Sequence, residues 1–280
     1  MADALTPPPP GNVPDGLPAA EQPADTRPAA IVVEHLTKRY DKVLAVDNIS
    51  FQVPQGEFFG FLGPNGAGKS TTIRVLCGLL RADYQRITVA GHDLRSDSLG
   101  VKASIGVMLE EPVLYERLSA REHLRFTGEL YGLSQAEADR RGLELLGMLS
   151  LEGDADRLIV DYSQGMRKKV ALACALIHKP PVLFLDEPFS GIDTVSSRQI
   201  KDLLRARVAQ GVTILFSSHV MEVVERLCTG VAIIHQGRLA FADTMANLQA
   251  RPDFDSLEDV FIRVVGQEEL TRAEDESWLG

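Results

Sequence analysis

Residues 63–70 have the types and spacing needed to hold phosphate. They read Gly-Pro-Asn-Gly-Ala-Gly-Lys-Ser, which fits the pattern G-x-x-x-x-G-K-S/T between a predicted strand ending at Leu62 and a predicted helix beginning near Thr71. Glycines let such a loop turn tightly and aim its N–H groups inward, where the helix dipole also favours negative charge. We expect Lys69 to neutralise the β- and γ-phosphates of a nucleotide and Ser70 to offer its hydroxyl to Mg²⁺. The predicted phosphate-binding residues are Gly63, Pro64, Asn65, Gly66, Ala67, Gly68, Lys69, Ser70 and Thr71.

The alternative is a glycine-rich loop that binds no ligand. Chance produces this pattern in roughly one chain in a hundred of this length, given ordinary glycine usage. The loop also lies between a predicted strand and a predicted helix, where phosphate binding requires it. Pattern and context together therefore favour a phosphate site.

Two adjacent carboxylates follow a second apolar run. Val182–Leu185 has the length and composition of a buried strand, and Asp186 and Glu187 come directly after it. Ligands collect at the carboxyl ends of parallel strands, so we expect Asp186 to bind the Mg²⁺ beside the phosphate loop. Glu187 would then polarise a water in line with the γ-phosphate, as a general base or a water-orienting group. Alone, such a run is often only a strand entering a turn, and it is the phosphate loop that favours the catalytic interpretation.

The composition is that of a globular protein and excludes few functions. The chain has 280 residues, 45% apolar and 24% charged, enough for one sizeable domain or a domain with an insert. Its net charge of −10 arises at the ends, because residues 1–30 hold four acids and one arginine, and residues 253–280 hold nine acids and two arginines. An acidic total that arises at the two ends argues against non-specific nucleic-acid binding but says little about a site in the neutral body; we expect no nucleic-acid partner. The widely spaced Cys77, Cys174 and Cys228 suit a reduced cytosolic protein and are expected to be small core residues.

Patterns along the chain divide it into three segments, the middle one of which contains an insert. Residues 1–30 hold eight of the fifteen prolines and are predicted to be a disordered Pro/Ala-rich extension, and residues 251–280 an acidic tail. Between them, residues 31–250 alternate strand and helix signals, which indicates a mixed, largely parallel sheet covered by helices. A mostly helical insert is expected at 94–161, where Ser119 with Glu122 and Ser134 with Glu137 form two predicted capping boxes. No apolar run reaches the roughly 18 residues of a membrane-spanning helix, so any membrane role is expected to be one of docking.

Three further motifs narrow the purpose of the nucleotide site. The segment 161–170 reads Asp-Tyr-Ser-Gln-Gly-Met-Arg-Lys-Lys-Val, the segment 190–193 reads Ser-Gly-Ile-Asp, and Ser-Ser-His at 217–219 closes the next predicted strand. In this order and spacing they resemble the signature motif, the D-loop and the H-loop of the ATP-binding cassette (ABC) family, over about residues 31–250. The resemblance implies a P-loop NTPase (ABC ATPase) core with an inserted helical subdomain.

The resemblance also implies a composite site. Two cassettes, forming a homodimer or a heterodimer, would close head to tail over two ATP molecules, each held by the phosphate loop of one chain and the signature of the other. Ser163 and Gly165 are the signature residues expected to meet phosphate, whereas Tyr162, Gln164 and Met166 depart from the usual Leu-Ser-Gly-Gly-Gln. Ser163 can also cap the helix that follows it.

Four other positions carry expectations from the family. Asp193 of the D-loop is expected near nucleotide, and His219 is expected to contact the γ-phosphate, although a lone histidine is more often a surface or core residue. Tyr40 lies where the family has an aromatic ring that stacks on adenine, with a half-buried tyrosine at a strand edge as the alternative. Glu110 stands where the family usually has glutamine, and it can approach Mg²⁺ or its waters but cannot donate a hydrogen bond as an amide does.

The narrower features resemble one branch of the family. Glu110, Tyr115, the Tyr-Ser-x-Gly-Met form of the signature and the segment 256–261 are similar to prokaryotic exporters of drugs, sodium ions or polysaccharide. This implies a separate polytopic membrane permease subunit and a location at the cytoplasmic face of the membrane. We hypothesise that the permease docks on residues 110–121, because this segment lies beside the γ-phosphate sensor and can move as the site closes. The residues Arg167–Lys169 are interpreted as a solvated helix face. A soluble ABC ATPase that acts on ribosomes, DNA or cofactor assembly, and a binding module with degraded catalysis, are the alternatives.

Overall fold

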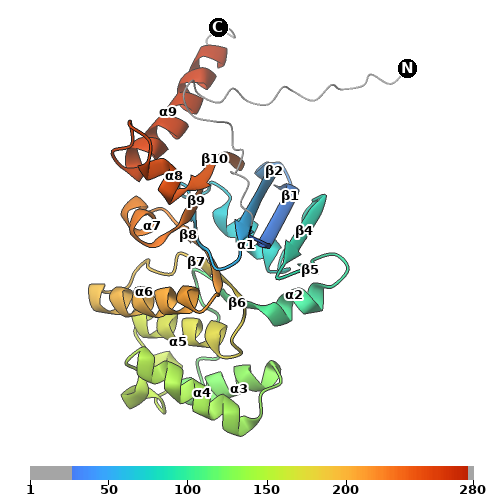
Figure 1. The fold of residues 1–280 in the computed structure, drawn as a ribbon. Coiled ribbons are helices and arrows are strands. Elements are labelled where there is room, and N and C mark those ends of the chain that lie inside the picture. The colour runs from blue at the N-terminus through green and yellow to red at the C-terminus, as the bar shows by residue number, and fades with distance from the viewer. Residues whose placement is uncertain (1–26, 277–280) are drawn as a thin grey trace.

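The computed structural model describes residues 27–276, with side chains for residues 27–266. Most of the predicted disordered extension of residues 1–30 lies outside the described residues. Within them, the chain forms two sheets and a set of helices that cover them (Figure 1).

The larger sheet has six strands and supports the nucleotide motifs. In spatial order these are β10 (Arg238–Thr244), β9 (Gly230–His235), β3 (Phe58–Leu62), β8 (Thr213–Ser218), β7 (Val182–Asp186) and β6 (Ile105–Met108). The edge strand β10 is antiparallel to β9, whereas the other neighbours pair in parallel. The prediction of a mixed, largely parallel sheet is confirmed, and burial on both faces explains why β3, β7 and β8 are unbroken buried runs.

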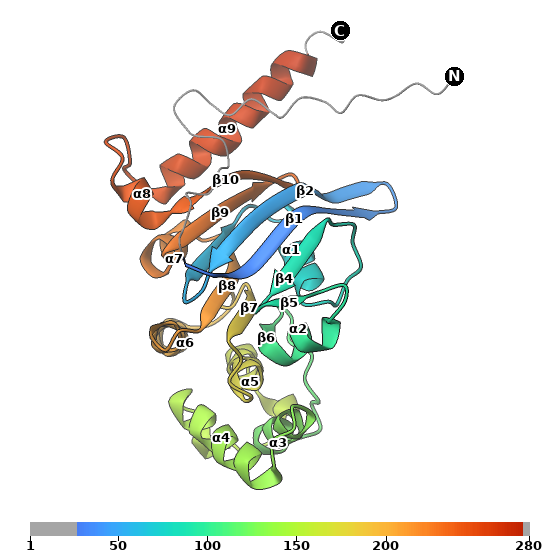
Figure 2. The ribbon, with the colours of Figure 1, turned by 45° about the vertical axis from the view of Figure 1, so that its right-hand side comes forward.

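A second, antiparallel sheet lies beside the first. Its strands, in spatial order, are β2 (Val43–Pro54), β1 (Ala29–Tyr40), β4 (Arg86–Val89) and β5 (His92–Asp93). Figure 2 shows this sheet lying across the upper part of the larger one. Side chains alternate between faces along a strand, so Phe59 and Phe61 of β3 join the core shared with the second sheet. Phe58 and Leu62 face the other way, into a core shared with helices.

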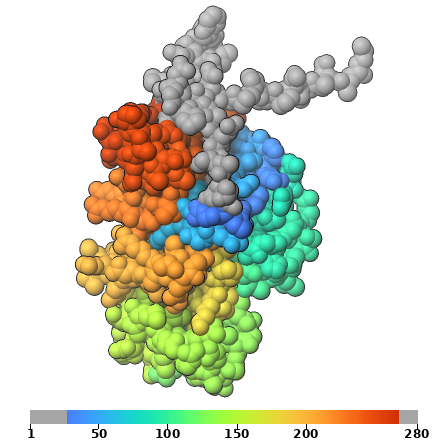
Figure 3. Space-filling model, in the orientation of Figure 1, coloured from blue at the N-terminus to red at the C-terminus, as the bar shows by residue number. Residues whose placement is uncertain are grey.

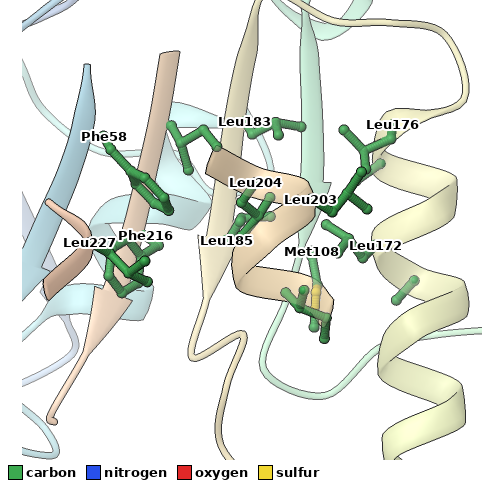
Figure 4. Close-up of a cluster of buried hydrophobic side chains, with 14 of the residues drawn as sticks. Phe58, Met108, Leu172, Leu176, Leu183, Leu185, Leu203, Leu204, Phe216 and Leu227 are labelled. Atoms are coloured by element: carbon green, nitrogen blue, oxygen red, sulfur yellow. The ribbon is translucent and has the colours of Figure 1, made fainter. Parts of the chain in front are cut away.

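The helices complete the layers. They are α1 (Lys69–Leu76), α2 (Ser98–Ser104), α3 (Ala120–Leu130), α4 (Gln135–Met148), α5 (Gln164–Leu176), α6 (Thr194–Ala209), α7 (Met221–Leu227), α8 (Met245–Gln249) and α9 (Leu257–Glu276). Figure 4 shows the core formed where α5 and α6 pack on the larger sheet, with Leu172, Leu204 and Phe216 among its members. No helix within residues 27–276 has the length and apolar character needed to cross a bilayer.

The helical insert begins later than the sequence predicts. Residues 105–108, inside the predicted insert of 94–161, form strand β6, which pairs in parallel with β7 at the edge of the larger sheet. The strand is only four residues long and lies between helical patterns, so its period could not be recognised. The helices that follow, α3 and α4, form the end of the molecule opposite α9, as the green and red surfaces of Figure 3 show.

The acidic segment 251–280 contains a helix that was not predicted from its composition. Within the described residues it forms α9, whose Leu257, Val260 and Val264 are buried in the main core. The backbone N–H of Leu257 donates to a carboxylate oxygen of Glu225 on α7. The first turns of α9 are therefore part of the packed domain.

The two predicted capping boxes differ in the structure. At α3 both halves form: the Ser119 hydroxyl accepts from the Glu122 N–H, and the Glu122 carboxylate accepts from the Ser119 N–H at 2.8 Å. At α4 the Ser134 hydroxyl accepts from the Glu137 N–H, but the Glu137 carboxylate binds Arg140 and Arg141 instead. Those ion pairs hold the pKa of Glu137 at about 2.

Because only the cap of α3 is reciprocal, two matched serine-to-alanine substitutions should lower the free energy of unfolding by different amounts. Ser119→Ala removes a buried, reciprocal cap and should lower the free energy of unfolding by about 1 to 2 kcal/mol. Ser134→Ala removes one exposed cap bond and should lower it by about 0.5 to 1 kcal/mol. Urea denaturation followed by circular dichroism measures both. A larger loss for Ser134→Ala would show that the reciprocal bond at α3 adds no stability.

Candidate active site

The phosphate loop lies between β3 and α1, as predicted, and is pressed against two neighbouring strands. Gly68, which caps α1, has φ 110°, a conformation that favours glycine. A Cβ there would lie 2.5 Å from the carbonyl oxygen of Ala45 on β2, and a Cβ on Gly63 would lie 2.3 Å from that of Ile234 on β9. Only glycine fits at these two positions, so the loop holds its shape without side chains.

The same geometry leaves the start of α1 suited to an anion. A glycine at the N-cap offers no side-chain acceptor to the first N–H groups of the helix. Ser70 and Thr71 lie in this first turn, where N–H groups and the helix dipole favour negative charge. The predicted phosphate-binding residues 63–71 thus form one loop that leads directly into the first turn of α1.

Lys69 is buried and folded over its own loop. Its ammonium donates to the carbonyl oxygens of Gly63 at 2.6 Å and Pro64 at 3.0 Å. It also lies 3.9 Å from Glu187 Oε1. Burial lowers the pKa of Lys69, and the negative charges of Glu187, Asp186 and Glu110 act in the opposite direction. The lysine therefore lies between the phosphate loop and the carboxylates that follow β7 and β6.

Asp186 joins three elements at one carboxylate. Its Oδ1 accepts from the Ser70 hydroxyl at 3.0 Å and from the Ser217 hydroxyl at 2.6 Å, so α1, β7 and β8 meet there. Its Oδ2 is buried and has no hydrogen-bond partner within the described residues. A buried, unpaired carboxylate oxygen is costly unless something binds it. A carboxylate beside a serine hydroxyl is the set of hard oxygen ligands that Mg²⁺ prefers, so these residues fit that ion.

Glu187 is held next to it in a strained conformation. It has φ 47°, which is unusual for a residue with a side chain, and its N–H donates to the Ser217 hydroxyl at 2.9 Å. The Nδ1–H of His219 donates to Glu187 Oε1 at 2.9 Å, because a carboxylate can only accept. The Glu187 side chain is 9% exposed, whereas that of His219 is 46% exposed. The backbone thus aims the Glu187 carboxylate at both Lys69 and His219.

The signature residues lie at the start of α5, separate from the phosphate loop of the same chain. Ser163 caps α5, its hydroxyl accepting from the Met166 N–H at 3.3 Å, and it is exposed. Asp193 caps α6 in the same way, and the Ser196 hydroxyl and N–H hold the pKa of Asp193 below its usual value. A Cβ on Gly165 would lie 3.8 Å from Asp193 Oδ2, so signature and D-loop are neighbours. Within the described residues, no hydrogen bond or ion pair joins Ser163 to the phosphate loop.

Glu110 and Tyr40 lie at the borders of the site. Glu110 follows β6, is exposed, and is close enough for its charge to offset part of the effect of burial, which lowers the pKa of both Lys69 and Lys168. Tyr40 ends β1 and is 41% exposed, with the Lys38 ammonium 4.9 Å from its ring centre. Its strand pairs with β2, which carries the Ala45 that contacts Gly68. Both residues are therefore near the site without being bonded to its centre.

Ser217 and Lys168 contact the site in ways that the sequence motifs did not predict. Ser217 was seen only as part of the motif before His219, yet its hydroxyl links Asp186 to Glu187. The prediction that Arg167–Lys169 form a solvated face is wrong for both lysines, which are buried. Lys168 donates to the backbone behind Glu187 and Lys169 donates to Gln199. Arg167 is half-buried and donates to the carbonyl oxygens of Tyr162 and Val160.

Comparison with known proteins identifies the family. Residues 46–190 match the family described as ABC transporter. The chain is 40% identical over 224 residues to the linearmycin resistance ATP-binding protein LnrL of Bacillus subtilis, covering 80% of this chain and 72% of that protein. It is 38% identical over 256 residues to the daunorubicin/doxorubicin resistance ATP-binding protein DrrA of Streptomyces peucetius, covering 91% and 76%. The solved structure of an ATP-binding subunit of an ABC transporter superimposes with a TM-score of 0.78 at 32% identity, covering 84% of this chain and 99% of that one.

Fold, motifs and relatives agree, and the predicted family and fold class are confirmed. This chain belongs to the ABC transporter family, as one of its ATP-binding cassette proteins.

Proposed function

We propose that this chain binds ATP with Mg²⁺, hydrolyses it, and so powers export through a separate membrane subunit. The observation that carries the proposal is the meeting of Lys69, Ser70, Asp186 and Glu187 at one end of the larger sheet. These residues come from two motifs more than a hundred positions apart, and they supply the cation, the hydroxyl and the carboxylates that a magnesium-bound triphosphate needs. We place the cassette at residues 31–250.

Binding is the task of the phosphate loop. The N–H groups of the loop and of the first turn of α1 surround the phosphates, and Lys69 exchanges its bonds to Gly63 and Pro64 for phosphate oxygens. Ser70 and Asp186 hold Mg²⁺, which when bound neutralises phosphate charge as it builds up during hydrolysis. Glu110 would contact Mg²⁺ or its waters, and Tyr40 would stack on the adenine ring.

Hydrolysis depends on Glu187 and His219. Glu187 holds a water in line with the γ-phosphate and takes its proton, or orients it, at a carboxylate that the strained backbone keeps in place. The Nδ1–H of His219 fixes one oxygen of that carboxylate, and the same ring can donate to the γ-phosphate only when its other nitrogen also carries a proton. Lys69 offsets the charge that the γ-phosphate oxygens gain.

The position of the signature supports a site shared between two cassettes. Ser163 and Gly165 begin α5, a helix of thirteen residues whose N-terminal dipole and N–H groups favour an anion. Within the described residues they are not bonded to the chain's own phosphate loop, so they remain available to the nucleotide of a second cassette. Asp193, beside Gly165, lies at the same surface. Homodimer and heterodimer both satisfy this arrangement.

The membrane subunit would dock on residues 110–121. Val113 is 93% exposed and Tyr115 is 60% exposed, and the Tyr115 ring packs edge-on against His123 and Phe126. This apolar surface directly follows Glu110, so movement at the nucleotide can reach it. Docking there would hold the chain at the cytoplasmic face of the membrane. The names of LnrL and DrrA, both resistance proteins, support export over the soluble alternatives.

Lys69→Ala should weaken nucleotide binding itself. It removes a buried cation from the phosphate loop, and losing a charge-assisted contact to phosphate should raise the dissociation constant for Mg·ATP by about 10- to 100-fold. Isothermal titration calorimetry measures this, with the exposed Lys102→Ala on α2 as the control. Retained affinity in the Lys69 variant would remove that residue from the phosphate site.

Glu187→Gln should separate binding from chemistry. The amide cannot accept the proton of the attacking water, so the rate of phosphate release should fall by about 10²- to 10⁴-fold, while the affinity for Mg·ATP stays within about threefold. Dimers should accumulate with ATP, as measured by light scattering after size exclusion. Glu258→Gln on α9 is the matched control. Hydrolysis at the normal rate in Glu187→Gln would exclude the residue from the mechanism.

Val113→Glu should uncouple the chain from its membrane partner. A charge on the apolar docking surface should reduce binding to native membranes by more than about half while basal ATPase activity stays within about twofold. Co-sedimentation with native membranes and with protein-free liposomes tests this. Ile262→Glu, on the exposed side of α9, controls for the added charge. Equal loss of binding and ATPase activity would count against a docking role.

A further inference from the structure

Lys168 is a buried cation behind the active site that the mechanism above does not use. It lies on α5 and is 2% exposed. Its ammonium donates to the carbonyl oxygen of Glu187 at 3.0 Å and to that of Ser190 at 2.5 Å. The side chain therefore crosses from the signature helix to the backbone of the residue that is proposed to orient water.

Packing alone does not explain a charge at this position. An ammonium buried without partners is costly, and burial lowers the pKa of Lys168. The negative charges of Glu110, Glu187 and Asp186 act in the opposite direction, and two carbonyl oxygens accept its hydrogen bonds. A methionine would fill a similar volume with no desolvation cost. The use of lysine thus indicates a requirement for the bonds and the charge.

The two carbonyl groups lie at the two ends of one turn. The Ser190 N–H donates to the Glu187 carbonyl at 3.2 Å, which closes the turn over residues 187–190. Glu187 begins it with φ 47°, so the direction of its side chain depends on a backbone conformation that is unfavourable by itself. By binding both ends, Lys168 fixes that conformation.

Lys168 is connected to the signature through helix α5. Lys168 lies in the second turn of α5, five residues after the capping Ser163. The Gln164 side chain also packs against Gly191, where its amide atoms would lie 3.1 to 3.3 Å from a Cβ. A short helix moves as a rigid unit, so a displacement of Ser163 and Gly165 carries the Lys168 ammonium with it.

We propose that Lys168 is a positioning residue that couples the signature of this chain to Glu187 of the same chain. The inference rests on the proposed function, because it requires the nucleotide of a second cassette to bind Ser163 and Gly165. When that nucleotide fixes α5, Lys168 holds the 187–190 turn so that the Glu187 carboxylate faces its own water. Binding at one site thereby sets the catalytic geometry at the other.

The test is Lys168→Met in the full chain, assayed for Mg·ATP hydrolysis. We expect kcat to fall by at least tenfold while KM for ATP stays within about threefold, because the phosphate loop is untouched and only the orientation of Glu187 is lost. In the Glu187→Gln background, Lys168→Met should still form ATP-dependent dimers. Lys168→Gln, whose amide can donate to one of the carbonyls, should recover part of the lost kcat.

Lys169→Met is the control. Lys169 is the adjacent residue, is also buried, and donates to Gln199 at 2.9 Å on α6 rather than to the Glu187 turn. Its kcat should stay within about twofold of the original chain. If Lys168→Met keeps its kcat, or if Lys169→Met loses as much, the coupling role is refuted.

Two outcomes separate this inference from the proposed function and from misfolding. If the original chain neither hydrolyses ATP nor dimerises, the proposed function fails first, whereas a normal original chain with a normal Lys168→Met refutes only the coupling. If Lys168→Met does not fold, as shown by its thermal transition, Lys168→Gln decides. A folded Lys168→Gln with unchanged kcat overturns the proposal, and a selective loss of kcat supports it.

Discussion

The Asp186 carboxylate is the contact on which the rest of the site depends. It is fully buried at the end of β7, and it accepts from Ser70 at the start of α1 and from Ser217 near the end of β8. Parallel strands end at one edge of a sheet, so the central strands bring these groups together without long loops. One carboxylate oxygen accepts both hydroxyl bonds, and the other has no hydrogen-bond partner within the described residues and is the oxygen that the proposed Mg²⁺ would bind.

Charge is concentrated here because each ion is offset by others. Lys69 and Lys168 are both buried within electrostatic reach of Asp186 and Glu187, and the exposed Glu110 adds a third carboxylate. Removing one of these charged side chains would leave another buried charge without a partner. The cost of that unpaired charge is far larger than the net stabilisation that the complete set contributes. This balance also explains why the strained backbone of Glu187 is tolerated, since its N–H and its carbonyl are both bound.

The sequence predicted the parts of this site that are local and failed where tertiary structure decides. The phosphate loop and Asp186 could be placed from short motifs at the ends of predicted strands, and His219 from its resemblance to the family's H-loop; their roles toward a nucleotide stay predictions. Lys168 was misread because adjacent lysines ordinarily indicate solvent, and nothing in a linear pattern shows that a backbone turn will cover them. Strand β6 is too short to show a period, and α9 was missed because its buried Leu257, Val260 and Val264 lie among acidic residues. The role of Ser217 requires the pairing of β7 with β8, which no single segment encodes.

The segment 187–193 connects the proposed catalytic carboxylate to the D-loop. Its first residue, Glu187, is proposed to orient the water, and its last residue, Asp193, caps α6 beside Gly165 of the signature. Under the proposed function, the groups that serve the chain's own nucleotide and the groups offered to a second chain are thus joined by a few residues of backbone and one buried ammonium. A packed arrangement of this kind does not deform gradually, because its hydrogen bonds are either made or broken. If two such sites face each other as proposed, we expect them to close together and not independently, because Lys168 of α5 is bonded to this turn.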